Sequence, residues 1–241
     1  MNALRTMFSS KSERYEVVNR IATLRFDSSW REKCAIKYGS CGVIVDLCCR
    51  TGKLGFAISK RASPETVLVE LDFNKTMLRE SIAKKRLRHL QNPNGSTKKK
   101  MPDISYILGD VADLPLRENI VDTIAIAFGL RNLIYENRKA KKYLSELVRV
   151  IRIGGRFGCV ETGQPPNYFH RLLLHIYFLD FVPLIGWLQT KHRDIYNYLG
   201  RSATNFESVE NVKSILLDLG FRKVTFRHLT LAAFALFAAA K

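Results

Sequence analysis

Short apolar segments rich in Val, Ile and Leu alternate along the chain with segments whose apolar residues recur at helical spacing. Several of the short segments are continuously apolar, as strands covered on both faces of a sheet are. This alternation predicts an α/β domain in which helices cover both faces of the sheet. Seven segments have the length and composition of strands: 43–47, 67–71, 104–108, 122–127, 156–161, 223–229 and 231–238.

Two of the intervening segments have clear helical periodicity and clear ends. Apolar residues fall at helical spacing in 144–151 and again in 209–219. Gly154 and Gly155 follow the first of these predicted helices, and Gly220 stands where the C-cap of the second belongs. The last two predicted strands follow each other almost directly, which predicts a hairpin and one antiparallel strand.

The length and the cysteine content limit the class of protein. A chain of 241 residues can bury a sizeable core, and we expect one domain, 1–241. There is no run of 18 uncharged apolar residues, so we expect no transmembrane helix. The N-terminus lacks the apolar core of a secretory signal. Five cysteines without paired metal-ligand spacing are typical of a reduced, cytoplasmic protein.

Two adjacent cysteines, Cys48 and Cys49, follow the first predicted strand. Neighbouring side chains of an extended chain point to different sides, so these two cannot easily hold one metal ion. No C-x-x-C or H-x-x-H spacing stands nearby, and we expect no metal site. The alternative is a cofactor-binding turn, in which Thr51 and Gly52 open the following helix.

Carboxylates stand at the ends of three successive predicted strands. Asp46 ends the first, Asp72 closes the second, and Asp110 follows the third. In a doubly wound sheet the ligand lies at the carboxyl ends of the strands, and an acid after the second strand accepts hydrogen bonds from ribose hydroxyls. Any one of these acids alone is by default a turn or cap residue. Three in succession indicate a cofactor site.

The complete set resembles S-adenosylmethionine-dependent methyltransferases, whose seven-stranded sheet also ends in an antiparallel strand. The later segments narrow the resemblance to the ubiquinone/menaquinone biosynthesis C-methyltransferase family. The matching segments are "MFSSKSERYEVVNRIATLRFDSSWR" (7–31), "AFGLRNL" (127–133), "LVRVIRIGGRF" (147–157), "YNYLGRS" (196–202), "DLGF" (218–221) and "LTLAAFALFAAAK" (229–241). The resemblance covers nearly the whole chain, and "FGLRN" is its most specific element.

The resemblance implies a Rossmann-like seven-stranded methyltransferase sheet, mostly parallel with a C-terminal antiparallel strand and with helices on both faces. It also implies an N-terminal helical substrate cap at 1–40 and a helical insertion over the substrate pocket at 165–205. The implied cofactor is S-adenosylmethionine, which leaves as S-adenosylhomocysteine. The residues implied to bind it are Asp46, Cys48, Thr51, Gly52, Asp72, Phe73, Asp110, Val111 and Ala127.

The family transfers a methyl group to a ring carbon of a prenylated quinol. The resemblance therefore implies that Arg131 stabilises the phenolate and that Asn132 holds the quinol oxygen or a water. A purely structural alternative is that Arg131 pairs with Asp122 or caps a helix. The residues implied to line the ring pocket are Tyr15, Tyr196 and Tyr198, for which burial in the core is the alternative.

Three positions depart from the family pattern. The general methyltransferase loop is Asp-x-Gly-x-Gly-x-Gly, but Cys48 and Arg50 take the first two glycine places. If Arg50 has a positive φ it is strained there; otherwise its side chain swings away or reaches the cofactor's carboxylate. Ala127 stands where a small hydroxyl residue is usual. These departures leave open a homologue that binds the cofactor weakly or without catalysis.

The formal net charge of +17 is concentrated in two stretches. Residues 79–100 carry eight Lys or Arg against one Glu, and residues 138–156 carry seven against one. These stretches are either solvated helix faces or surfaces for nucleic acid or an anionic membrane. Methylation of RNA or of another small molecule is the second hypothesis. The end of the fourth predicted strand, 127–130, lacks the motifs of base-methylating relatives.

The aromatic segment 168–189 falls outside the alternation of strands and helices. His170, Arg171, His175, Asp180 and Pro183 interrupt it, and we expect it to be too interrupted to span a bilayer. It can form core helices, a lid over an apolar substrate, or an interfacial segment. A prenylated quinol lies in the bilayer, so we expect peripheral, reversible contact with an anionic membrane. The oligomeric state, a homodimer included, stays open.

Overall fold

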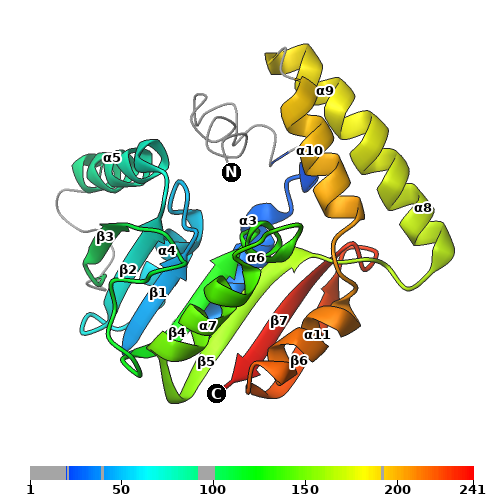
Figure 1. The fold of residues 1–241 in the computed structure, drawn as a ribbon. Coiled ribbons are helices and arrows are strands. Elements are labelled where there is room, and N and C mark those ends of the chain that lie inside the picture. The colour runs from blue at the N-terminus through cyan, green and yellow to red at the C-terminus, as the bar shows by residue number, and fades with distance from the viewer. Residues whose placement is uncertain (1–19, 21, 39–40, 92–100, 191–192) are drawn as a thin grey trace.

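The computed structural model describes residues 20, 22–38, 41–91, 101–190 and 193–241, and its centre is one sheet of seven strands (Figure 1). The strands are β1 (Val43–Leu47), β2 (Val67–Asp72), β3 (Ile104–Leu108), β4 (Val121–Ala127), β5 (Ile151–Thr162), β6 (Arg222–Leu229) and β7 (Phe234–Ala240). Their order in the sheet is β3-β2-β1-β4-β5-β7-β6. The pairs among β1 to β5 are parallel, whereas β7 runs antiparallel to both β5 and β6. The predicted sheet is therefore confirmed.

Helices cover both faces of the sheet, which explains why its strands are continuously apolar. In β4, Ala125 and Ala127 face one apolar core, and Ile124 and Ile126 face the other. The first core includes residues of α3 and α4, and the second includes residues of α6, α7 and α11, whereas α5 packs against β2 and β3. These helices are α3 (Asp27–Tyr38), α4 (Lys53–Ser59), α5 (Lys75–Gln91), α6 (Leu130–Ile134), α7 (Ala140–Val150) and α11 (Val209–Asp218).

Two predicted boundaries are wrong for identifiable reasons. β5 begins at Ile151, five residues earlier than predicted, because Ile151 pairs with Val121 of β4 before the register shifts. The predicted helix over 144–151 therefore ends at Val150. The hairpin between β6 and β7 has a turn at 230–233, where three successive residues have positive φ, so β7 begins at Phe234 and not at 231.

The aromatic segment forms a continuous helical rod of α8 (Tyr168–Ile176), the wider π-helical turn η1 (Tyr177–Phe181) and α9 (Val182–Thr190), and α10 (Arg193–Thr204) packs beside it (Figure 1). The expectation that polar residues and Pro183 interrupt this segment is wrong. In η1 the N–H of Val182 bonds to the carbonyl of Tyr177, five residues back. Pro183 directly follows this wider turn, and the rod continues past it although proline has no N–H to donate.

One part of this rod meets the criteria for a membrane span. By length and composition alone, the helical segment Tyr168–Leu188 is long and apolar enough to cross a bilayer, contrary to the expectation from the sequence. Only 28% of its most apolar stretch is buried within the protein.

The strand order creates a crevice at one edge of the sheet. β1 lies next to both β2 and β4, and the chain crosses from β3, at the edge, to β4 on the other side of β1. At such a reversal the connections after neighbouring strands diverge to opposite faces, which leaves room for a ligand at the carboxyl ends of the strands. The loops after β1, β2, β3 and β4, which carry the predicted site residues, all end at this edge.

Candidate functional site

The loop between β1 and α4 adopts a left-handed backbone at every second residue. Cys48, Arg50 and Gly52 have φ values of +57°, +54° and +74°. Gly52 also needs to be glycine for room, because a Cβ there would lie 2.0 Å from Oγ of Ser81. A left-handed conformation costs an L-residue about 1–2 kcal/mol. Cys48 and Arg50 are therefore strained, as the sequence predicted for Arg50 if its φ is positive.

Asp72, at the end of β2, fixes the position of this loop. Its Oδ2 accepts a hydrogen bond from the backbone N–H of Arg50 (2.9 Å), and its Oδ1 accepts one from Asn74 (2.8 Å). The residue is 3% exposed, and burial raises the pKa of its carboxyl while both hydrogen bonds act in the opposite direction. Each carboxylate oxygen has two lone pairs, so Asp72 retains acceptor capacity for ribose hydroxyls.

Asp46, in β1, is buried beneath the same loop. Its Oδ2 accepts a hydrogen bond from the N–H of Gly55 in α4 (2.8 Å). Burial, and then the negative charge of Glu70, raise the pKa of the Asp46 carboxyl well above its ordinary value. Its Oδ1 is buried and has no hydrogen-bond partner among the described residues. A buried oxygen without a hydrogen bond destabilises a folded protein, which indicates that this part of the loop has a role beyond packing.

The remaining predicted cofactor residues lie on the neighbouring strand ends. The N–H of Gly109 donates to the carbonyl of Asp72 (3.1 Å), which joins the loop after β3 to the end of β2. Asp110 is half-buried and forms an ion pair with Lys139 (3.1 Å). Of the others, Thr51, Val111 and Ala127 are buried and Phe73 is exposed.

The thiols of the two cysteines in this loop are unreactive. Burial raises the pKa of both the Cys48 and the Cys49 thiols, so that both stay protonated at neutral pH. Because the thiolate is the form that binds metals and attacks disulfides, these thiols are inert.

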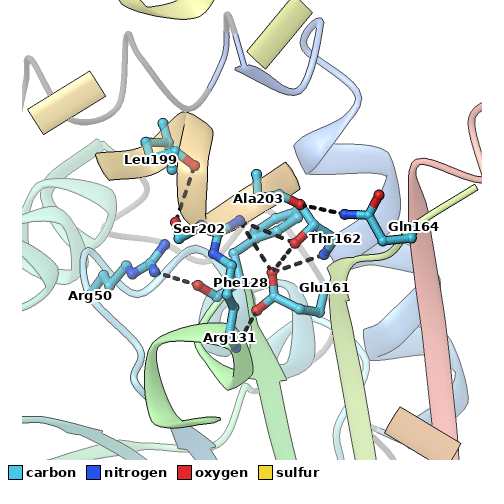
Figure 2. A network of polar contacts seen from close by, with 9 residues as sticks. All are labelled: Arg50, Phe128, Arg131, Glu161, Thr162, Gln164, Leu199, Ser202 and Ala203. Atoms are coloured by element: carbon cyan, nitrogen blue, oxygen red, sulfur yellow. Dashed lines mark hydrogen bonds and ion pairs between the residues drawn. The ribbon is translucent and has the colours of Figure 1, made fainter. Parts of the chain in front are cut away.

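Arg50 connects the loop after β1 to the end of β4 (Figure 2). Its guanidinium donates a hydrogen bond to the carbonyl of Phe128, a residue that also has a positive φ of +59°. The Phe128 ring lies 5.0 Å from the guanidinium carbon of Arg31 and contacts Trp30 at 6.2 Å between ring centroids. The side chain of Arg50 thus reaches from the loop after β1 to the end of the neighbouring strand β4.

Arg131, in α6, lies in a buried polar cluster at the ends of β4 and β5 (Figure 2). Its backbone N–H donates to Oε2 of Glu161 (3.0 Å), and its Nη1 donates to Oγ1 of Thr162 (3.1 Å). Nη1 also lies 3.9 Å from Oε1 of Glu161. Arg131 is 4% exposed and Glu161 is 0% exposed. The cluster is therefore an ion pair almost completely removed from water.

Arg131 does not pair with Asp122, the partner that the purely structural alternative gave it. Asp122 forms an ion pair with Arg152 and accepts a hydrogen bond from the N–H of Val43 (2.7 Å). Nε of Arg131 is buried and has no hydrogen-bond partner within the described residues. One donor of this guanidinium thus has no partner in the described chain. Asn132 is half-buried, and its carbonyl accepts a hydrogen bond from the side chain of Asn137 (3.0 Å).

A cavity of about 770 Å³ adjoins this cluster through Tyr135, whose N–H donates to the carbonyl of Arg131 (2.8 Å), but neither Arg131 nor Asn132 is among the residues that line it. The insertion 165–205 supplies all of its lining except Tyr135 and Glu136. The other lining residues are His175, Leu179, Asn197, Tyr198, Arg201, Thr204 and Asn205. Burial raises the pKa of Tyr198, and the positive charge of Arg131 acts in the opposite direction. The cavity is therefore within electrostatic reach of Arg131.

The three predicted pocket tyrosines have different positions. Tyr198 lines the cavity, whereas Tyr196 is buried in the core against Gly186, where a Cβ would lie 2.3 Å from the Tyr196 ring. Tyr15 lies outside the described residues. The described part of the predicted 1–40 cap, α3, packs against α4, β4 and β5 and gives no residue to the cavity.

His175 is a cavity residue that the sequence analysis missed. It lies in the last turn of α8, and its Nε2 is buried without a hydrogen-bond partner among the described residues. The signal that points to it is a histidine in an otherwise apolar run, "RLLLHIYF". Gln164 anchors the insertion nearby, because its side chain donates to the carbonyl of Ala203 in α10 (3.1 Å, Figure 2).

Replacing Arg50 with glycine tests the strained loop. We expect Arg50→Gly to leave the fold intact and cofactor affinity undiminished or higher. The substitution removes about 1–2 kcal/mol of strain and one hydrogen bond worth about 0.5–1.5 kcal/mol. Arg50→Ala is the matched control, because it loses the same hydrogen bond but keeps the strain, and it should unfold more easily than the glycine variant. Calorimetry with S-adenosylhomocysteine and thermal unfolding measure both effects. Loss of binding in Arg50→Gly would show instead that Arg50 holds the cofactor's carboxylate.

Comparison with known proteins connects this geometry to a family. The profile of the ubiE/COQ5 methyltransferase family matches residues 2–241. A demethylmenaquinone methyltransferase from Oceanobacillus iheyensis is 30% identical over 228 residues, which are 93% of this chain and 89% of the relative. One from Lactobacillus johnsonii is 32% identical over 232 residues, or 95% of this chain and 89% of the relative.

Solved structures agree on the fold. An S-adenosylmethionine-dependent methyltransferase from Aquifex aeolicus matches with a TM-score of 0.59 and 17% identity, over 92% of this chain and 97% of that one. A methyltransferase from Thermotoga maritima, described as a possible histamine N-methyltransferase, matches with a TM-score of 0.62 and 13% identity, over 98% of each chain. The family profile spans nearly the whole sequence, and the solved structures share its fold. The chain therefore belongs to the ubiE/COQ5 methyltransferase family and is an S-adenosylmethionine-dependent methyltransferase.

Proposed function

We propose that this enzyme methylates a ring carbon of a prenylated quinol, as in menaquinone or ubiquinone biosynthesis. The observation that carries the proposal is the cavity of about 770 Å³ beside the buried Arg131. Aromatic rings and hydrogen-bonding groups line this cavity together, and a bound hydroxylated aromatic ring would use both kinds of contact. The names of the relatives, demethylmenaquinone methyltransferases, favour the same class of acceptor.

The residues of the crevice fit S-adenosylmethionine. Asp72 and Asp110 are carboxylates at neighbouring strand ends, suited to ribose hydroxyls and to an adenine amino group. The left-handed turn ending at Gly52 brings backbone close to them, and Oδ1 of Asp46 lacks a partner among the described residues. When bound, this cofactor supplies an activated methyl group. The chain's own part in catalysis is then alignment of the acceptor and stabilisation of charge on it.

Arg131 is the residue that we assign to charge stabilisation. A ring carbon becomes a good nucleophile when a hydroxyl on the ring gives up its proton, and a fixed guanidinium favours the resulting oxyanion. Glu161 and Thr162 hold two sides of Arg131 in place, which preorganises it. Tyr198 and His175, which line the cavity, and Asn132 are the polar groups that we assign to holding the ring oxygens. The helices of the insertion form most of the wall of the cavity.

A labelled methyl-transfer assay separates the proposed acceptor from RNA. We expect the purified enzyme to label a short-chain quinol under reducing conditions and to leave transfer RNA unlabelled. The reason is that the end of β4, Ala127-Phe128-Gly129-Leu130, lacks a base-methylating motif, although the net charge of +17 suits nucleic acid. Labelled RNA with unlabelled quinol would instead favour RNA as the methyl acceptor. Absence of both products, with the cofactor still bound, would favour the weakened homologue suggested by Arg50 and Ala127.

A further inference from the structure

The exposed side of the helical rod α8–η1–α9 is mostly apolar, and we call its exposed apolar side chains the rod face. Figure 1 shows the rod at the outer edge of the molecule, beyond the sheet. Its residues are all at least 41% exposed, far more than core positions are. They are Tyr168, Phe169, Leu172, Leu173, Ile176, Leu179, Phe181, Leu184, Trp187 and Leu188. Exposed apolar surface of this extent, gathered on one element, indicates an interaction site.

The opposite side of the rod is packed on the domain, which decides between spanning a bilayer and lying on it. Leu174, Phe178 and Val182, spaced by four residues, are buried in the core, and Phe178 packs 6.4 Å from the Phe234 ring of β7. The helix α10 also packs on η1 and α9. A membrane span would have to break these contacts. The rod can offer only its exposed side to lipid, as an interfacial helix does.

Charge distinguishes an anionic bilayer from a second copy of the chain as the partner of this face. Two molecules with a formal net charge of +17 each repel one another, whereas an anionic lipid surface attracts both. The rod itself carries only one Arg and one Asp between 168 and 188, so little charge opposes its burial. Tyr168 and Trp187 lie near its two ends, and such side chains favour the headgroup region.

We propose that the rod face docks reversibly in the interface of an anionic lipid bilayer. Leu179 belongs to the rod face and also lines the cavity, so docking places an edge of the cavity at the lipid. An apolar acceptor can then enter the cavity from the bilayer without crossing water. The docking itself goes beyond the proposed reaction, because it depends on the exposed face and the charge and not on which acceptor is methylated.

Flotation with lipid vesicles free of quinol tests the docking. The full chain should float with vesicles of phosphatidylcholine and phosphatidylglycerol at low salt, should be released at high salt, and should not float with phosphatidylcholine alone. The double variant Phe181→Ser/Trp187→Ser should lower the partition coefficient at least about tenfold, since two exposed anchors are lost. Ile153→Ser is the matched control, because Ile153 is 81% exposed but lies outside the rod, and it should bind like the wild type.

Each result supports or contradicts the docking. Leu184→Ser/Leu188→Ser serves as a second pair, and thermal unfolding confirms that each variant is folded. Absence of lipid binding at low salt, or equal binding by the wild type and both pairs, would contradict the proposal. So would a solution dimer that the rod variants dissociate, because the rod face would then be covered by a second copy. Methyl transfer to a water-soluble quinol reports separately on the proposed function.

Discussion

Replacing Asp72 with alanine is expected to weaken binding of S-adenosylhomocysteine at least about tenfold. Hydrogen bonds to a charged group are worth about 1.5–3 kcal/mol, and 1.4 kcal/mol is a factor of ten in affinity. The variant also releases the loop, because the N–H groups of Arg50 and Asn74 both donate to this carboxylate. Calorimetry with the purified protein measures the loss.

Two further variants separate the loss of the ligand contact from the loss of the loop. Asp72→Asn keeps the side-chain volume and one acceptor oxygen but removes the charge, so its affinity should lie between those of the wild type and the alanine variant. Asp113→Ala removes an exposed carboxylate from the nearby surface and should bind normally. Unchanged affinity in Asp72→Ala would show that Asp72 does not hold the ribose hydroxyls.

Replacing Arg131 with methionine is expected to affect stability and activity together. Breaking a buried ion pair from one side costs about 3–5 kcal/mol, because the carboxylate of Glu161 is left buried with its charge uncompensated. Loss of one oxyanion-stabilising donor lowers kcat by about 10²–10³-fold. Thermal unfolding and the quinol assay measure the two effects.

The double variant Arg131→Met/Glu161→Gln tells the structural role of Arg131 from its catalytic role. A neutral glutamine can still accept the backbone N–H that donates to Glu161, and it removes the uncompensated charge. We therefore expect most of the stability to return while methyl transfer stays about 10²-fold or more below that of the wild type. Return of activity along with stability would mean that Arg131 serves only to hold the fold.

The sheet was predictable because its strands are buried on both faces. Segments such as 43–45 and 124–127 are continuously apolar, and few other structures use such short runs. The positions of Asp46 and Asp72 followed from the same logic, since an acid in the last residues of a buried strand lies near the sheet edge. Register is less visible in sequence. The early start of β5 at Ile151 depends on its pairing with Val121, a contact made through space.

The continuity of the helical rod was not predicted, because each polar residue and Pro183 counts as an interruption when it is taken alone. Pro183 looks like a helix breaker, but it directly follows a π-helical turn, and the rod continues past the missing donor. The side chains that break the apolar run, such as Arg171 and Asp180, lie on the exposed side of the rod. Polar residues on the solvent-exposed side of a helix do not interrupt it.

The partner of Arg131 could not be predicted, because Glu161 lies thirty residues further along the chain, on β5. The sequence offered Asp122 as a partner, but the order of the strands brings the end of β5 beside α6. The cavity was beyond prediction for a similar reason. It forms between the connection after α6 and the inserted helices, so that Tyr135 and His175 meet only once both are folded.

The position of the transferred methyl group tests the central claim most directly. The enzyme would be incubated with cofactor carrying a ¹³C-labelled methyl group and with a reduced short-chain quinol, and the product analysed by NMR and mass spectrometry. The account predicts one labelled methyl bonded to a ring carbon, formed by the wild type and reduced in Asp72→Ala and Arg131→Met/Glu161→Gln. A labelled methyl on oxygen, or none on the quinol although the cofactor binds, would contradict it.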